Sequence, residues 1–163
     1  MRRALLLVSV TLVGLAVAPL ATADKPIREV IPAPDDIVIT GQCAFPVLAH
    51  IDGSEVDTTF VDKAGNPTRL LGTFPGNKLT LTHVGTSKTL TLPATGSFQL
   101  RANRDGTASV KVTGHGPSFP NPITGELGIW YLSGQLSATL DAGGNVTSMK
   151  NTGQLVNLCP ALT

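Results

Sequence analysis

From residue 37 onward, apolar and polar residues alternate along this chain with a period of two. The clearest example lies in 79–83 and 88–92, where leucines alternate with threonines on both sides of Gly85-Thr86-Ser87. Alternation on both sides of a turn predicts a β-hairpin. The same pattern predicts a second hairpin in 98–102 and 108–112, with its turn at Arg104-Asp105-Gly106.

Further strands are predicted on both sides of these hairpins. They are 45–51 near the start, 127–132 paired with 135–140, and 146–150 and 154–158 after a turn at 141–145. Strand patterns therefore recur about every ten residues, a spacing typical of an all-β sandwich or barrel. After residue 23 no window has the 3.6-residue spacing of an amphipathic helix, so very little helix is expected.

The alternation also indicates how the strands are arranged. A parallel sheet is covered on both faces and has continuous apolar runs, so clean alternation favours antiparallel strands with one solvated face. A long series of hairpins leaves two exposed edges, and curling the sheet until its ends meet removes them. We therefore expect an all-β fold with a single antiparallel meander barrel or a strongly curled sheet. A two-sheet β-sandwich is the alternative.

The N-terminus has the three parts of an export signal. Arg2 and Arg3 precede an apolar run over 4–20, and Ala21-Thr22-Ala23 forms a small-residue cleavage site. We expect a signal peptide over 1–23, cleaved after Ala23, and hence a secreted, extracellular protein without stable membrane insertion. An uncleaved membrane anchor is the alternative, because the apolar run approaches spanning length.

The mature chain divides into a leader and one domain. Pro26, Pro32 and Pro34 disfavour helices and central strands, so 24–36 is expected to be an extended, mobile leader, with ordered structure beginning near Ile37. The segment 37–163 is long enough for a single all-β domain.

The charge balance argues against a nucleic-acid partner. The chain has 12 Lys and Arg against 11 Asp and Glu, a net charge of +1, and removal of Arg2 and Arg3 leaves a slight acidic excess. The linear sequence shows no run of basic residues. We therefore expect no binding to nucleic acid or to an anionic lipid surface.

Cys43 and Cys159 are the only cysteines of the chain. Two thiols in an exported protein are expected to pair, and neither belongs to a C-x-x-C pattern that would indicate redox chemistry. The predicted disulfide would join the entry of the strand 45–51 to the end of the last strand. The first and last parts of the sheet should therefore lie within bridging distance.

The three histidines are the first places to look for chemistry. His50 and Asp52, together with Glu55 or Asp57, would form a metal or acid–base cluster, but Asp52-Gly53-Ser54 is also typical of a turn, and we favour the turn. His115 has no His, Cys or Glu partner at metal-ligand spacing. No catalytic residue, metal ligand or cofactor is assigned.

Four residues are candidates for ligand or partner binding. Phe119 lies in the proline-rich segment 116–125, the longest break in the strand pattern. Trp130 and Tyr131 follow it and would place an aromatic patch at the same end of the sheet. His83 has the same parity as Leu79 and Leu81, which places it on the apolar face.

The layout resembles small secreted proteins of actinobacteria that have no assigned activity. The resemblance rests on the arginine-bearing signal, Cys-Ala-Phe-Pro-Val at 43–47, Asp105-Gly106-Thr107, the Asp/Gly turn at 141–145 and Leu-Val-Asn-Leu-Cys at 155–159. Its motifs are turns and cysteines and imply no function. The residues above favour a secreted, non-enzymatic β domain that binds a small apolar ligand or a cell-surface partner. The alternatives are a barrel or sandwich enzyme with a histidine and carboxylate site, and a structural component of the cell envelope.

Overall fold

The computed structural model describes residues 25–163, which form twelve strands and one short 3-10 helix. The predicted signal peptide lies outside these residues. The strands are β1 (Ile27–Pro32), β2 (Ile37–Ile39), β3 (Val47–Asp52), β4 (Ser54–Val61), β5 (Pro67–Phe74), β6 (Lys78–His83), β7 (Thr89–Pro93), β8 (Gly96–Ala102), β9 (Ala108–Ser118), β10 (Trp130–Leu140), β11 (Val146–Asn151) and β12 (Gln154–Asn157), and the helix is η1 (Cys159–Leu162). No helix in this part of the chain is long and apolar enough to cross a bilayer.

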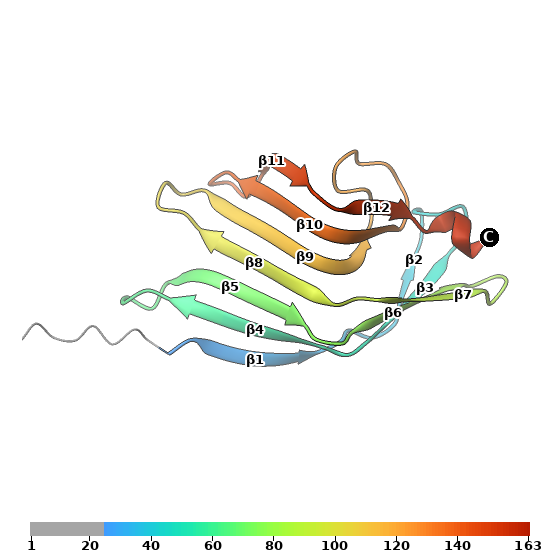
Figure 1. Ribbon diagram of the computed structural model, residues 1–163, viewed down its shortest axis with the longest axis horizontal. Helices are drawn as coiled ribbons and strands as arrows, with labels where there is room; N and C mark the ends of the chain where they lie inside the picture. Colours follow the sequence, from blue (N-terminus) through green and yellow to red (C-terminus); the bar gives the residue numbers. More distant parts are fainter. Residues whose placement is uncertain (1–24) are drawn as a thin grey trace, which may run out of the picture.

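The strands form two antiparallel sheets of unequal size (Figure 1). The large sheet has the order β1-β4-β5-β8-β9-β10-β11, and β12 also pairs with β10. The small sheet has the order β2-β3-β6-β7 and lies at one end of the large one, beside η1 and the C-terminus (Figure 1). The prediction of an all-β antiparallel fold with very little helix is confirmed.

The predicted single sheet is wrong, because the strands divide between two sheets. In the part of the chain that the structure describes, β1 and β11 are the edges of the large sheet and do not pair, so no closed barrel forms. The chain passes between the two sheets four times, from β1 to β2, β3 to β4, β5 to β6 and β7 to β8. Both hairpins predicted from alternation are present, as β6–β7 and β8–β9.

The best buried core lies at the small sheet. The alternating residues Val47 and Ala49 of β3 and Leu79 and Leu81 of β6 are all at most 5% exposed. The segments around β2, β7, β10, β12 and η1 complete the cluster with Ile39, Ala94, Ile129, Leu158 and Leu162. The period-two alternation in the sequence therefore predicts which residues of β3 and β6 are buried, because every second side chain of a strand points to the same face.

The predicted hairpin 127–132 with 135–140 is wrong. A single strand, β10, runs from Trp130 to Leu140 and passes through Gly134 at a φ of +129°. Gly134 pairs with Gly114 of β9, whose φ is +108°. Glycine adopts such angles without the steric penalty of a side chain, so the strands bend together at this point instead of ending.

Ordered structure begins earlier than the sequence predicted. The segment expected to be a leader contains β1, which pairs with β4 over Ile27–Pro32. Pro26 and Pro32 flank or end this strand, and proline is compatible with an edge strand whose outer N–H groups face solvent.

The Cys43–Cys159 disulfide is confirmed, with Cα atoms 5.6 Å apart and a sequence separation of 116 residues. Its position gives it a different role from the one predicted. Cys43 precedes β3 of the small sheet, whereas Cys159 begins η1 after β12 of the large sheet. The bridge therefore fastens the two sheets to each other.

Candidate functional site

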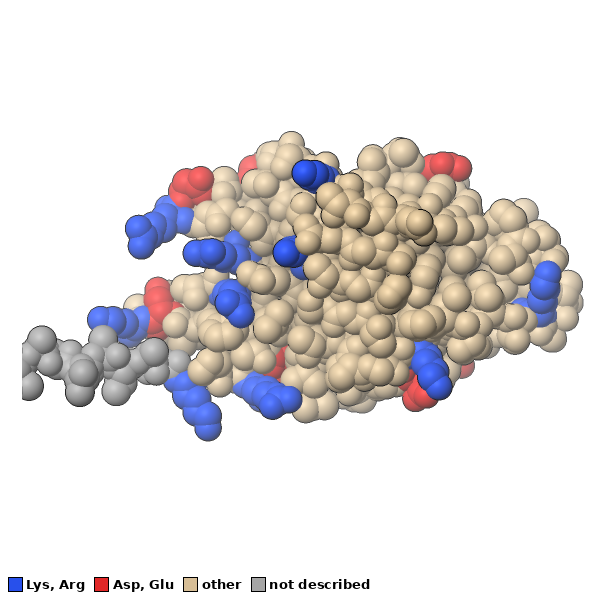
Figure 2. Space-filling view, in the orientation of Figure 1, with Lys and Arg blue, Asp and Glu red and all other residues tan. Residues whose placement is uncertain are grey.

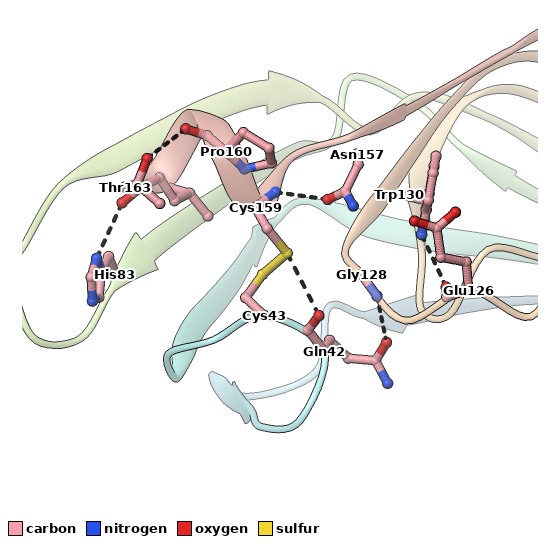
Figure 3. Close-up of a disulfide and its surroundings, with 11 residues drawn as sticks. Gln42, Cys43, His83, Glu126, Gly128, Trp130, Asn157, Cys159, Pro160 and Thr163 are labelled. Atoms are coloured by element: carbon pink, nitrogen blue, oxygen red, sulfur yellow. Dashed lines mark hydrogen bonds between the residues drawn. A yellow bond between two sulfur atoms is a disulfide. The ribbon is translucent and has the colours of Figure 1, made fainter.

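The four candidate binding residues from the sequence occupy separate surroundings. The ring of His83 stacks on Phe45 at a centroid distance of 3.9 Å. Its Nδ1 lies 3.1 Å from the carbonyl oxygen of Leu162, a contact drawn as a dashed line from His83 in Figure 3. These contacts give His83 a role in holding the C-terminal helix against the small sheet.

The two neighbouring aromatic residues of β10 also make structural contacts. Trp130 Nε1 donates to the carbonyl oxygen of Glu126 at 3.2 Å, which closes the preceding loop (Figure 3). Tyr131 donates its hydroxyl to the carbonyl oxygen of Pro93 at 2.8 Å, and partial burial raises its pKa. Phe119 is 41% exposed and, with Pro34, Ile37 and Ile51, borders a narrow crevice of about 30 Å³.

The histidine and carboxylate cluster weighed in the sequence does not assemble. His50 Nδ1 lies 2.6 Å from a carboxylate oxygen of Asp36, and both side chains are about half exposed. Asp52 ends β3 and Gly53 turns the chain at a φ of +135°, so the turn is confirmed. Among residues 25–163 no group of three His, Cys, Asp or Glu side chains is placed to hold a metal ion.

The main concave feature with apolar walls is a cleft of about 380 Å³, called here the apolar cleft. It lies where the end of β3 meets the large sheet. Phe98, Val112 and Leu136 form one wall, because they are register partners on β8, β9 and β10. Other apolar residues that line it are Ile51, Phe74, Ala94, Pro117, Pro122 and Leu132.

Glycines give the apolar cleft its floor. A Cβ atom at Gly114 would lie 2.3 Å from the carbonyl oxygen of Thr95, and one at Gly96 would lie 2.2 Å from that of Thr113. These clashes show that β8 and β9 approach more closely here than side chains would permit. By contrast, a Cβ at Gly116 would meet no atom within 4 Å, so this position opens onto free space.

A few polar groups reach the walls of the apolar cleft. Asn77 is only 4% exposed, and its side-chain oxygen accepts the Ser54 backbone N–H at 3.1 Å. Ser97 and Thr113 also line the cleft, but they alternate with Phe98 and Val112 along the strands, so their hydroxyl groups lie on the opposite face and bond to each other at 2.7 Å. His115 lies at the edge, with its ring 6.0 Å from that of Tyr131. An apolar wall with few polar groups is typical of a small-molecule site.

The segment after β9 is ordered by its own hydrogen bonds. Asn121 is 6% exposed, and its side-chain oxygen accepts the N–H groups of Ile123 and Thr124. The backbone N–H of Asn121 donates to the carbonyl oxygen of Glu126, and the backbone N–H of Gly125 donates to the carbonyl oxygen of Asn121. The loop therefore holds Pro122 in a fixed position against the apolar cleft.

A pair of carboxyl groups lies elsewhere on the large sheet. Glu55 and Asp57 are on the same face of β4, and both crowd the position of Gly72. Desolvation, with a hydrogen bond and charge repulsion from Asp57, raises the pKa of Glu55. Neither residue lines the apolar cleft, although Asp57 lies on the same face and in the same row as Phe98, with Gly72 between them.

None of the four candidate residues from the sequence lines the apolar cleft; Phe119 borders the small crevice, which shares Ile51 and Pro117 with the cleft. The relevant pattern was present, because Phe98 and Val112 were assigned to the apolar face of one predicted hairpin. What the sequence lacked was the register of β10 and the position of β3. Comparison with protein-family models, with curated proteins and with solved structures finds no significant match to this chain.

Proposed function

We propose that this protein is a secreted, non-enzymatic β domain that binds a small apolar molecule in the apolar cleft. The observation that carries the proposal is the cleft itself, about 380 Å³ in volume and lined by aromatic, aliphatic and proline side chains. Apolar surface exposed to water is unfavourable, so a ligand that covers the walls of the cleft lowers the free energy.

Two features of the apolar cleft favour a ligand over a filled core. Gly96, Gly114 and Gly116 keep its floor free of side chains. Residues of the wall, including Phe98, Val112 and Leu136, remain only partly buried. A molecule seated there would bury them further.

The polar groups suggest what kind of apolar molecule fits. Asn77 uses its side-chain oxygen for Ser54, which leaves its amide nitrogen as a donor at the wall. A largely hydrocarbon ligand with one acceptor oxygen would match both the apolar walls and this donor.

The catalytic alternative needs a reactive group at the apolar cleft. Its proposed centre, His50, pairs instead with Asp36 at 2.6 Å and is exposed. The carboxyl pair of Glu55 and Asp57 also lies outside the apolar cleft. Binding without catalysis therefore accounts for the geometry most simply.

The proposal is tested by filling the apolar cleft from within. Gly116 pairs with Leu132, a wall residue, and a Cβ atom in its place would meet no atom within 4 Å, so a leucine can start into the cleft from this position. We expect the mature chain to bind the neutral fluorescent probe N-phenylnaphthylamine. Gly116→Leu should weaken this binding about tenfold, which corresponds to the loss of about two buried methylene groups from the contact between probe and cleft.

The matched control is Ala64→Leu, which adds a leucine in the exposed turn between β4 and β5. This variant should bind the probe like the parent chain. Absence of probe binding, or equal weakening by both variants, would rule out the apolar cleft as the site. If the probe results are as expected, native mass spectrometry of protein from its own culture medium is the experiment that identifies the natural ligand.

A further inference from the structure

The register of the large sheet separates its charged residues by sign. Paired residues of neighbouring strands point to the same face. Arg28, Lys111 and Lys150 belong to one continuous row of partners that also includes Gln99 and Ser137.

The next row along the sheet adds two more cations. Arg69 of β5 is the direct partner of Arg101 of β8. The acidic residues of the large-sheet strands, Glu29, Glu55 and Asp57, all have the opposite parity and lie on the other face. One face therefore carries every strand cation of this sheet and no strand carboxylate, and we call it the basic face.

The cations of the basic face have no carboxylate counter-ion among the residues that the structure describes. Within residues 25–163 the single ion pair joins His50 to Asp36, and no Lys or Arg pairs with an Asp or Glu side chain. Lys88, beside the small sheet, donates to the main-chain oxygen of Thr163 at 2.6 Å. Like charges directly opposite each other, such as Arg69 and Arg101, destabilise a sheet. Arg69 packs over the Phe60 ring at 4.3 Å, and its buried Nε has no hydrogen-bond partner.

The aspartates nearest to this face are already engaged. Asp62, Asp105 and Asp141 lie in the turns at the end of the large sheet, where hydrogen bonds from their own turns lower the pKa of each. Asp141, for example, accepts the backbone N–H groups of Gly143 and Asn145. These carboxylates cap turns and do not cover the cations.

A shallow trough of about 410 Å³ crosses the basic face over β8 to β11. Arg101, Lys111 and Lys150 border it, together with the polar side chains of Gln99, Asn103, Ser109, Ser137, Thr139 and Ser148. In Figure 2 Lys and Arg side chains are spread over the large sheet, on the side turned to the viewer. Lys111 and Lys150 are two strands apart, about 9.6 Å at the usual strand spacing.

We propose that the basic face binds a linear acidic polysaccharide, laid across the strands along this trough. The cations would meet its acidic groups, and the hydroxyl and amide side chains between them would hydrogen-bond the sugar hydroxyls. This binding activity is independent of the apolar cleft, whose wall of Phe98, Val112 and Leu136 lies on the opposite face.

The side chains of the basic face favour a polysaccharide over a nucleic acid. Proteins that bind single strands combine a basic groove with exposed aromatic rings on which the bases stack. No aromatic side chain lines the trough over β8 to β11. Phe60, the aromatic residue in the row of Arg69, is covered by that guanidinium.

The test compares three polymers and two double variants. We expect alginate oligosaccharides to bind the mature chain in biolayer interferometry, neutral dextran not to bind, and binding to weaken as salt is added. Lys111→Gln/Lys150→Gln should reduce alginate affinity about tenfold, the effect of two exposed charge contacts. Lys78→Gln/Lys88→Gln makes the same change in net charge on and beside the small sheet and should change affinity less than about twofold.

The outcomes separate the proposal from its rivals. Equal losses in both double variants would show that net charge alone attracts alginate and would overturn the proposal. Oligothymidylate binding as tightly as alginate, with the same loss in Lys111→Gln/Lys150→Gln, would assign the face to nucleic acid instead. All four lysines are exposed, so Lys111→Gln/Lys150→Gln should keep the melting temperature of the parent chain. Lys88 donates to the main-chain oxygen of Thr163 at 2.6 Å, so the melting temperature of Lys78→Gln/Lys88→Gln is measured beside its affinity to show that the control is folded.

Discussion

Removal of the Cys43–Cys159 disulfide should destabilise the domain severely, because the bridge joins its two sheets. The perturbation is Cys43→Ala/Cys159→Ala. The bridge closes a loop across a separation of 116 residues, and its loss frees the unfolded chain to adopt many more conformations. In the chain-entropy model this loop corresponds to about 5 kcal/mol at room temperature.

This magnitude is between about a third and the whole of the stability of an ordinary domain, about 5–15 kcal/mol. The same substitution also removes packing, since both cysteines contact the core cluster around Leu81 and Leu162. Urea unfolding at neutral pH, followed by the fluorescence of Trp130, measures the free energy of unfolding and its denaturant dependence. We expect a loss of about 5 kcal/mol and a steeper dependence on urea, because the unfolded chain becomes less compact.

Two controls isolate the bridge. The parent chain unfolded in the presence of a reductant should match the double variant, and the exposed neighbouring substitution Ala44→Ser should change stability by less than about 0.5 kcal/mol. A loss of under about 1 kcal/mol in the double variant would refute the loop-entropy argument and show that the sheets hold together without the bridge.

Three further predictions follow from the packing, the backbone and the turns. Leu81→Ala should cost about 2–5 kcal/mol in urea unfolding, because Leu81 is 0% exposed, whereas Val84→Ala, at 53% exposed, should cost under about 0.5 kcal/mol. Gly114→Ala should lower the melting temperature far more than Gly144→Ala: both have positive φ, but only at Gly114 would the new Cβ lie 2.3 Å from a carbonyl oxygen. Asp62, Asp105 and Asp141 have pKa values in the folded protein below the ordinary 3.8. Their ionised carboxylates therefore contribute fully to stability above pH 3.8, and this contribution is lost as the pH falls through the lowered pKa values. Replacing all three by Asn should therefore flatten the fall in melting temperature below about pH 4, and an unchanged acid profile would contradict this.

The parts of the fold that the sequence predicted correctly are those fixed by local pattern. Leu79 and Leu81 alternate with threonines up to a short turn, so strand, face and hairpin partner are all encoded within about fifteen residues. The disulfide was also predictable, because two cysteines in an exported chain have only one way to pair.

The errors came from interactions between distant segments. Gly134 looks like the turn of a hairpin, but its partner Gly114 lets both strands bend and continue. The segment at Ile27–Pro32 has a weak strand pattern and is ordered by pairing with β4. Neither partner is indicated by local sequence, because pairing depends on tertiary context.

The charge distribution shows the same limit. The sequence has no run of basic residues, and the separate hairpins already placed Arg101 and Lys111 on a polar face. Arg28, Arg69 and Lys150 join them only through the register of seven strands. A patch assembled across strands is invisible in the linear sequence, whereas one along a single helix or strand would be visible.

The most direct test of the proposed apolar cleft is an NMR titration of the mature chain with N-phenylnaphthylamine. Glycine amide signals from the floor of the cleft report on a bound molecule. We expect the amide signals of Gly96, Gly114 and Gly116 to shift with a common saturation, while those of the exposed turn glycines Gly41 and Gly144 stay in place. Shifts confined to other parts of the domain, or no shifts at saturating probe, would contradict the account.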